Sequence, residues 1–230
     1  MMKTSFGSTT YQQDVPYQVL VPETGGRGCP LIIALHGMGQ SGAIFAERTA
    51  SKIGGHDRVV LIPDGPLPFE VNVKGERREG KAWYIYTGDQ EAFLESVKKT
   101  EAHLLDLIDR VIESTKADPD RVWLMGFSQG GYAAGVVALR HCARFAGLVS
   151  VSSRIKAEIL DGERAPDGAP RLFALHGASD TSVNPEAARE SVEQLKALGF
   201  DATFELFDSG HRINDAMLLR LNEILPGKRP

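Results

Sequence analysis

The stretch with the most chemical content is residues 121–131, Arg-Val-Trp-Leu-Met-Gly-Phe-Ser-Gln-Gly-Gly. An apolar run at 122–125 leads into a G-x-S-x-G string centred on Ser128, and residues 132–140 are typical of a helix. A serine on so sharp a turn has strained backbone geometry, and the glycines leave room where a Cβ would clash. The pattern predicts a nucleophilic hydroxyl at the edge of a sheet. The simpler interpretation is a serine that only caps the helix.

A serine nucleophile needs a base to take its proton, and position separates the six histidines. We expect His211 to be the base, because it follows the last expected strand on a loop at the same sheet edge as Ser128. His36 and His176 are the alternatives. Each lies in a Leu-His-Gly turn, where an imidazole is expected to tie a loop together. The other three are expected to have surface or packing roles: His56, His103 and His141.

The base needs a carboxylate to orient it, and Asp180 follows the strand that precedes the one leading to His211. Asp208 competes for this role, but it stands so close to His211 in sequence that it is expected to shape the turn. Asp64 and Asp215 are weaker candidates. In this scheme Ser128 attacks a carbonyl carbon, His211 relays the proton, and Asp180 fixes the tautomer.

A tetrahedral oxyanion needs hydrogen-bond donors. The backbone N–H of Gln129 lies at the expected helix start, and the glycine-containing loop 36–42 lets main chain approach a ligand. Within that loop we expect the N–H of Met38 to be the second donor. The alternative is that these glycines serve only the strand-to-helix turn.

Bulk properties exclude several classes of protein. The chain has 230 residues, 42% hydrophobic and 24% charged, which suits one globular domain over residues 1–230. A net charge of −4 and the lack of a basic stripe argue against nucleic-acid binding. No apolar run reaches about 18 residues, so we expect no membrane span. Residues 1–10 lack the apolar core of a secretory signal, and the two cysteines, Cys29 and Cys142, suit isolated thiols, so a cytoplasmic location is expected.

Elements alternate between short apolar runs and amphipathic segments, which predicts an α/β fold with a mostly parallel, doubly wound sheet flanked by helices. The expected strands are residues 17–21, 30–35, 59–62, 121–125, 146–151, 171–175 and 202–207. Helices are expected over 92–115, with apolar residues on one face, and from Pro185 to Gly199 after an Asn184 cap. Two segments do not fit this sheet, 66–91 and 153–170. We interpret them as irregular, cleft-covering loops, with a charged, solvated stretch at 74–81.

The combined motifs resemble the phospholipase/carboxylesterase family of small α/β-hydrolases, which includes acyl-protein thioesterases and bacterial carboxylesterases. The matching motifs are Leu35-His36-Gly37-Met38-Gly39, Gly126-Phe127-Ser128-Gln129-Gly130-Gly131, His176-Gly177-Ala178-Ser179-Asp180 and Gly210-His211. This resemblance implies the α/β-hydrolase fold, hydrolysis of esters or acyl thioesters without a cofactor, a Ser128–Asp180–His211 triad, and oxyanion donors at Met38 and Gln129. Trp83 matches a tryptophan common in such enzymes.

Two departures from the family pattern bear on the substrate. Where relatives often have an aromatic residue and a Leu-Pro pair, this chain has Ser152-Ser153-Arg154-Ile155-Lys156, and the segment at 70–82 is unusually charged. Arg154 is expected either to face solvent or to meet an anionic part of the substrate. We therefore expect a small or medium carboxylic ester, with no metal.

Rival hypotheses remain at this point. An acyl thioesterase or lysophospholipase of the same fold would need a long pocket lined by Leu67, Phe69, Trp83 and Tyr84. A peptidase or cofactor-free haloperoxidase has no specific support. A non-catalytic binding protein on this scaffold would usually lack a triad member, whereas all three candidates are present here. A metal hydrolase is disfavoured because no His pair has the spacing of metal ligands. The expected partner is a small-molecule ester, and a homodimer is compatible with the sequence.

Overall fold

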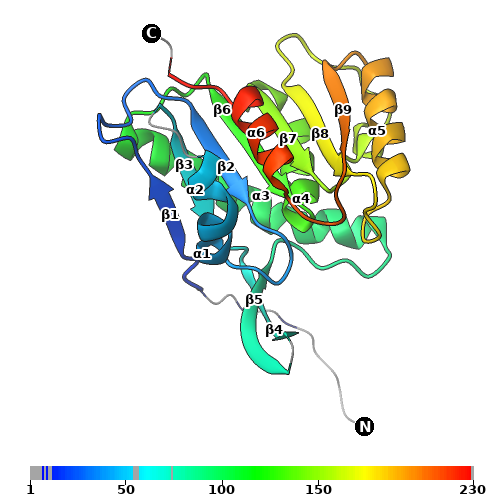
Figure 1. The fold of residues 1–230 in the computed structure, drawn as a ribbon, viewed down its shortest axis with the longest axis horizontal. Coiled ribbons are helices and arrows are strands. Elements are labelled where there is room, and N and C mark those ends of the chain that lie inside the picture. The colour runs from blue at the N-terminus through cyan, green and yellow to red at the C-terminus, as the bar shows by residue number, and fades with distance from the viewer. Residues whose placement is uncertain (1–6, 8, 10–11, 54–56, 74, 229–230) are drawn as a thin grey trace.

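A computed structural model describes residues 7, 9, 12–53, 57–73 and 75–228, so the sequence-based expectations for residues 1–6, His56 and Lys74 lie outside the described residues. A seven-stranded sheet has the order β1-β3-β2-β6-β7-β8-β9 (Figure 1). Its strands are β1 (Tyr17–Leu20), β2 (Leu31–Leu35), β3 (Val59–Pro63), β6 (Val122–Phe127), β7 (Gly147–Val151), β8 (Arg171–Gly177) and β9 (Ala202–Phe207). Strand β1 pairs antiparallel with β3, and every other pairing in this sheet is parallel.

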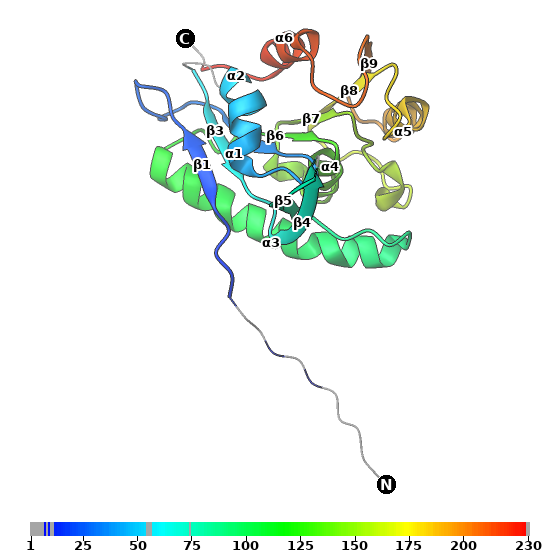
Figure 2. The same cartoon turned by 60° about the horizontal axis from the view of Figure 1, so that its bottom comes forward.

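Helices cover both faces of the sheet (Figure 2). The helical elements are α1 (Gly42–Phe45), the π-helical turn η1 (Ala46–Ala50), α2 (Ser51–Ile53), α3 (Gln90–Thr115), α4 (Gln129–Arg140), α5 (Pro185–Ala197), α6 (Asp215–Ile224), and the 3₁₀ turns η2 (Cys142–Arg144) and η3 (Ala157–Leu160). Helices α1, α2 and α6 pack on one face, and α3, α4 and α5 pack on the other. The expected α/β-hydrolase fold with a doubly wound sheet is therefore confirmed.

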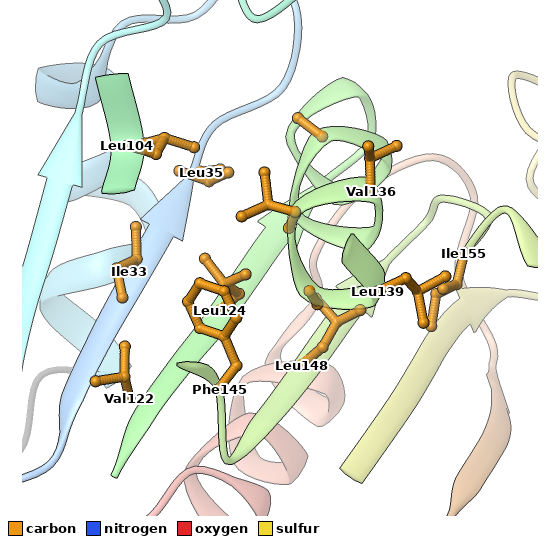
Figure 3. Packing of buried hydrophobic residues seen from close by; sticks show 14 of the residues in the cluster. Ile33, Leu35, Leu104, Val122, Leu124, Val136, Leu139, Phe145, Leu148 and Ile155 are labelled. Carbon is orange, nitrogen blue, oxygen red and sulfur yellow. The ribbon is translucent and has the colours of Figure 1, made fainter. Parts of the chain in front are cut away.

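Burial explains why the central strands are apolar along their whole length. All five residues of β2 and all five of β3 are buried, as expected for parallel strands covered by helices on both faces. Figure 3 shows side chains of the larger core cluster, where Ile33 and Leu124 of the sheet lie near Val136 and Leu139 of α4. This packing holds the carboxyl ends of β2, β6, β8 and β9 at one edge of the sheet.

Side chains that cap the helices define where they begin. The carboxylate of Asp89 accepts a hydrogen bond from the N–H of Ala92 at the start of α3, and Asn214 accepts one from Met217 at the start of α6. The predicted cap at Asn184 is confirmed, since its side chain accepts from Glu186 and Pro185 follows it.

The prediction that residues 66–91 are irregular is wrong for most of their length, although residues 76–79 of the charged stretch are exposed as expected. Strands β4 (Leu67–Val73) and β5 (Glu76–Ala82) pair antiparallel as a separate two-stranded sheet. Four consecutive charged residues, 76–79, are exposed on β5. They give no alternating pattern, because this hairpin extends away from the main core and buries little of its own surface.

Candidate active site

Ser128 lies at a sharp turn between β6 and α4. Its backbone has φ 51° and ψ −120°, a strained conformation for a residue with a side chain. A Cβ on Gly126 would lie 2.3 Å from the carbonyl oxygen of Gly130, and one on Gly130 would lie 2.5 Å from the carbonyl oxygen of Leu35. Because only glycine fits at both positions, the close approach of β2, β6 and α4 depends on these two residues.

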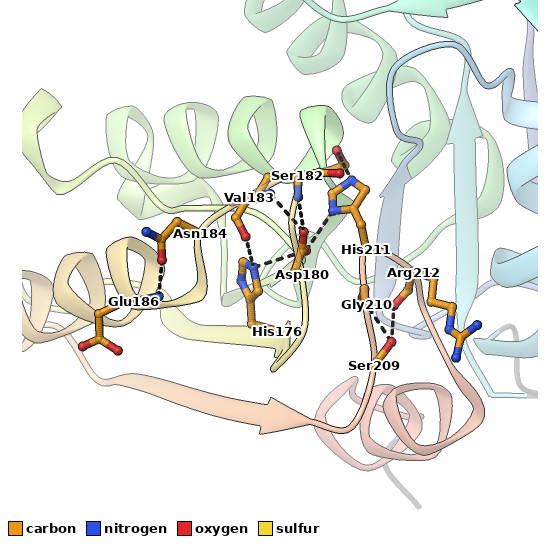
Figure 4. Close-up of polar contacts among 11 residues, drawn as sticks. His176, Asp180, Ser182, Val183, Asn184, Glu186, Ser209, Gly210, His211 and Arg212 are labelled. Carbon is orange, nitrogen blue, oxygen red and sulfur yellow. Dashed lines mark hydrogen bonds and ion pairs between the residues drawn. The ribbon is translucent and has the colours of Figure 1, made fainter.

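The imidazole of His211 joins the serine to a carboxylate. Its Nδ1 lies 2.8 Å from Oδ2 of Asp180, and its Nε2 lies 2.9 Å from Oγ of Ser128. Figure 4 shows His211, on the loop after β9, facing Asp180, on the loop after β8. An ionised carboxylate can only accept, so Nδ1 donates to Asp180 and Nε2 is left to accept from the serine hydroxyl.

The loop around Asp180 keeps this carboxylate ionised. Its side chain is buried, which opposes ionisation, but the backbone N–H groups of Val183 and Ser182 each donate to Oδ1 at 2.9 Å. These hydrogen bonds, together with the one from His211, outweigh burial and lower the pKa of Asp180 below its usual value. Asp180 is therefore suited to orient an imidazole and to stabilise its protonated form.

The two alternative histidines have other contacts. Nε2 of His176 lies 3.0 Å from the carbonyl oxygen of Val183 and 3.3 Å from Oδ2 of Asp180. In His36, Nδ1 donates to the carbonyl of Gly37, and Nε2 accepts from the N–H of Gly65. Burial lowers the pKa of both, so they are neutral groups that tie loops together, as expected from their Leu-His-Gly turns.

The competing carboxylates lie in other hydrogen-bonding roles. Asp64 accepts from the N–H of Gly42 at 2.6 Å, and Asp215 begins α6. Asp208 contributes its backbone carbonyl to a hydrogen bond from Asn214. Of the four aspartates considered, Asp180 is the one that the structure brings to His211.

Two backbone amides are available near the serine hydroxyl. Gln129 is the first residue of α4, where N–H groups have no partner within the helix. The N–H of Met38 also has no acceptor among the described residues, and both residues border the same cavity as Ser128. The loop of Met38 is braced by the side chain of Gln40, which accepts from the N–H of Gly37 at 3.0 Å.

A cavity of about 720 Å³ opens beside Ser128, within the size range of small-molecule sites. Its walls include four of the five side chains predicted to bind substrate: Leu67, Phe69, Tyr84 and Arg154. Met38, Ser128 and Gln129 also line the cavity, and the rest of its wall comes from residues that were not predicted to bind substrate: Pro68, Ala82, Ile85, Tyr86, Phe93, Tyr132, Lys156, Ser182 and Val183. Most of these residues are apolar or aromatic.

The prediction that Trp83 contacts substrate is wrong. Its side chain is fully buried and does not line the cavity. The indole N–H instead donates to the carbonyl of His36 at 2.7 Å, because a buried indole needs an acceptor. Its backbone N–H donates to the side chain of Gln129, whose amide group donates in turn to the carbonyl of Tyr84. Trp83 therefore supports the cavity wall from behind.

Lys156 also lines the cavity, although it is not among the residues predicted to bind substrate. It follows Arg154 by two positions after the end of β7, and both residues line the cavity. Two cations at the carboxyl end of a parallel strand were a usable signal, since ligands bind at that edge of such sheets.

No group of three potential ligand residues is placed to hold a metal ion within the ranges that the structure describes. Over those same ranges, no helix has the length and hydropathy that crossing a bilayer requires.

Comparisons with known proteins give a consistent result. The model of a family described as phospholipase/carboxylesterase matches residues 19–226. Acyl-protein thioesterase 1 of Emericella nidulans is 32% identical over 196 residues, which cover 76% of this chain and 80% of that protein. The corresponding protein of Gibberella zeae is 28% identical over 201 residues, with 78% and 82% covered.

Solved structures show the same fold at lower identity. Esterase PE8 matches with a TM-score of 0.73 and 21% identity, covering 93% of this chain and 98% of that one. Acyl-protein thioesterase 2 of Zea mays matches with a TM-score of 0.70 and 21% identity, covering 90% and 96%.

Proposed function

Starting from the phospholipase/carboxylesterase family of α/β-hydrolases, to which this chain belongs, we propose that Ser128, His211 and Asp180 form the catalytic triad of a carboxylesterase. The observation that carries this proposal is the continuous hydrogen-bonded chain from the serine hydroxyl through the imidazole to the carboxylate, 2.9 and 2.8 Å long at its two contacts. It lies next to a cavity large enough for an ester.

The geometry supports a two-step acyl transfer. The oxygen of Ser128 attacks the ester carbonyl while its proton passes to Nε2 of His211, and the carbonyl electron pair moves onto oxygen. The N–H groups of Met38 and Gln129 stabilise that oxyanion. The intermediate then expels the alcohol, which takes the proton from His211. A water molecule, activated by the same imidazole, attacks the acyl-enzyme and releases the acid and free serine.

We propose carboxylic esters of small or medium size as substrates. The cavity is large enough for a short acyl chain. Arg154 and Lys156 in its wall make it less suited to a long and wholly apolar acyl chain. An acyl thioesterase is the second candidate. Aromatic and aliphatic side chains along the wall favour it, among them Leu67, Phe69 and Phe93, as do the names of the sequence relatives.

Hydrolysis of nitrophenyl esters and acyl thioesters, matched in acyl length from two to sixteen carbons, tests this proposal. We expect kcat/KM to be highest for esters with short acyl chains and to fall steeply as the chain lengthens. A maximum on long acyl thioesters would favour the second candidate. We expect Ser128→Ala to lower kcat at least about a thousandfold, with an unchanged circular dichroism spectrum. Unchanged turnover in this variant would overturn the triad.

A further inference from the structure

The cavity beside Ser128 has an unusual distribution of charge. Among the described residues that line it, the side chains with a full charge are Arg154 and Lys156, and no carboxylate lines it. Both cations come from the segment between β7 and η3. Cations in a concave, largely apolar wall act over a longer range than cations in water, because fewer water molecules screen them.

Lys156 is held in place rather than left free in solvent. Its ammonium group donates to the side-chain oxygen of Gln90 at 2.6 Å, and it lies 4.7 Å from the ring centre of Phe93 and 5.8 Å from that of Tyr86. Only 8% of the residue is exposed, and this burial lowers the pKa of the ammonium group. An anion beside it would offset part of the cost of burying the charge.

One carboxylate is shared between these two cations. Glu158 forms an ion pair with Arg154, and its carboxylate lies 3.6 Å from the ammonium group of Lys156. Its side chain is 40% exposed, so water solvates it. Two positive charges with one paired negative charge leave a net charge of +1 in this group. That excess matches a singly charged anion such as a carboxylate better than a doubly charged phosphate.

Two tyrosines add hydrogen-bond donors to the same wall. Tyr84 and Tyr132 line the cavity, and burial raises the pKa of both hydroxyls, so both stay protonated near neutral pH. A carboxylate in this part of the cavity would have cations and O–H donors within one lining surface. Charge-assisted hydrogen bonds of this kind are stronger than those between neutral groups.

We propose that this enzyme selects esters that carry a free carboxylate, which Arg154 and Lys156 bind while the ester carbonyl lies at Ser128. The inference rests on the proposed function and adds the substrate class to it. Arg154 and Lys156 are then specificity-determining residues, and Glu158 limits how strongly they attract the anion.

Two pairs of esters, each differing by one charge, test the inference. In the first, 4-nitrophenyl hydrogen adipate and 4-nitrophenyl methyl adipate differ at the far end of the acyl chain. In the second, 4-acetoxybenzoate and its methyl ester differ on the leaving group. We expect the carboxylate of at least one pair to have a kcat/KM about tenfold or more above that of its methyl ester. The favoured pair identifies the side of the ester that lies near the cations.

Variants separate recognition of charge from a structural role. Arg154→Gln and Lys156→Met should each reduce the carboxylate-to-methyl-ester ratio of kcat/KM about tenfold, mainly through KM. Glu158→Gln should raise the ratio, because it removes the competing carboxylate, and a purely structural role would not predict an increase. Arg171→Gln is the control. Arg171 is an exposed residue at the start of β8 that pairs with Asp201, so this variant should hydrolyse both esters of each pair at the wild-type rate.

The outcomes separate this inference from the proposed function. If wild-type enzyme hydrolyses both members of each pair at equal rates, the preference for anions is wrong and the esterase activity stands. A ratio that stays the same in Arg154→Gln, Lys156→Met and Glu158→Gln also overturns the inference. If no ester is hydrolysed and a fluorophosphonate does not label Ser128, the proposed function is wrong and the inference falls with it.

Discussion

Asp180 determines which nitrogen of His211 carries a proton. Its Oδ2 accepts from Nδ1 of the imidazole, while the amides of Ser182 and Val183 keep the carboxylate ionised. Nε2 is thereby left as the acceptor for the serine hydroxyl. A side-chain amide at position 180 would present a donor to Nδ1, which favours the wrong tautomer.

We therefore expect Asp180→Asn to lower kcat by about a thousandfold or more, with little change in fold. Asp208→Asn is the matched control, because this nearby aspartate has its backbone carbonyl, and not its carboxylate, in the loop hydrogen bond. The measurement is kcat at neutral pH on a short nitrophenyl ester. Equal losses in the two variants would contradict the assignment of Asp180.

Strand β5 braces the loop that carries Met38. The N–H of Gly39 donates to the carbonyl of Lys81 at 2.9 Å, and the N–H of Lys81 donates to the carbonyl of Gln40 at 3.0 Å. Gly80 allows this approach, since a Cβ there would lie 2.9 Å from Cα of Gly39. The hairpin therefore sets the position of one proposed oxyanion donor.

A methyl group at position 80 would displace that loop. We expect Gly80→Ala to lower kcat by up to about a hundredfold, because small misplacements at an active site have effects of this size. Gly135→Ala in α4 makes the same change where the nearest atoms are 3.5 Å away, and its kcat should match that of wild type. A Gly80→Ala enzyme with normal kcat would show that the hairpin does not position the loop.

All seven strands of the main sheet were predictable. The five inner strands are mostly buried apolar runs because helices cover both faces, and the edge strands β1 and β9 are less buried but still contain apolar residues. The hairpin was not predictable, since the exposed charges of β5 carry no alternating pattern. Ser128, Asp180 and His211 could be expected to meet at one sheet edge, because each follows the carboxyl end of an expected strand. The packing of Trp83 against His36 and the burial of Lys156 depend on tertiary contacts that no local pattern encodes.

Two buried histidines and one half-buried histidine make the stability of the whole molecule sensitive to acid. Burial lowers the pKa of His36, His103 and His176, so the folded state binds fewer protons than the unfolded state at mildly acidic pH. The free energy of unfolding therefore decreases as the pH is lowered from about 6.5. The decrease is about 1.4 kcal/mol per pH unit for each proton that the chain takes up on unfolding. The lowered pKa of Asp180 adds a further loss below pH 3.8.

Urea unfolding at pH 7.5 and pH 5.0 measures this effect. We expect a lower free energy of unfolding at pH 5.0, and a smaller difference between the two conditions in His103→Gln. An equal or higher free energy of unfolding at pH 5.0 would contradict the account of the buried histidines.

The central claim is that the hydroxyl of Ser128 is activated by its neighbours, and fluorophosphonate labelling followed by peptide mass spectrometry tests it most directly. We predict a single adduct on the peptide that contains Ser128, formed at least about a hundredfold more slowly in His211→Ala. An adduct on another residue, or labelling of Ser128 at the same rate without the imidazole, would contradict the account.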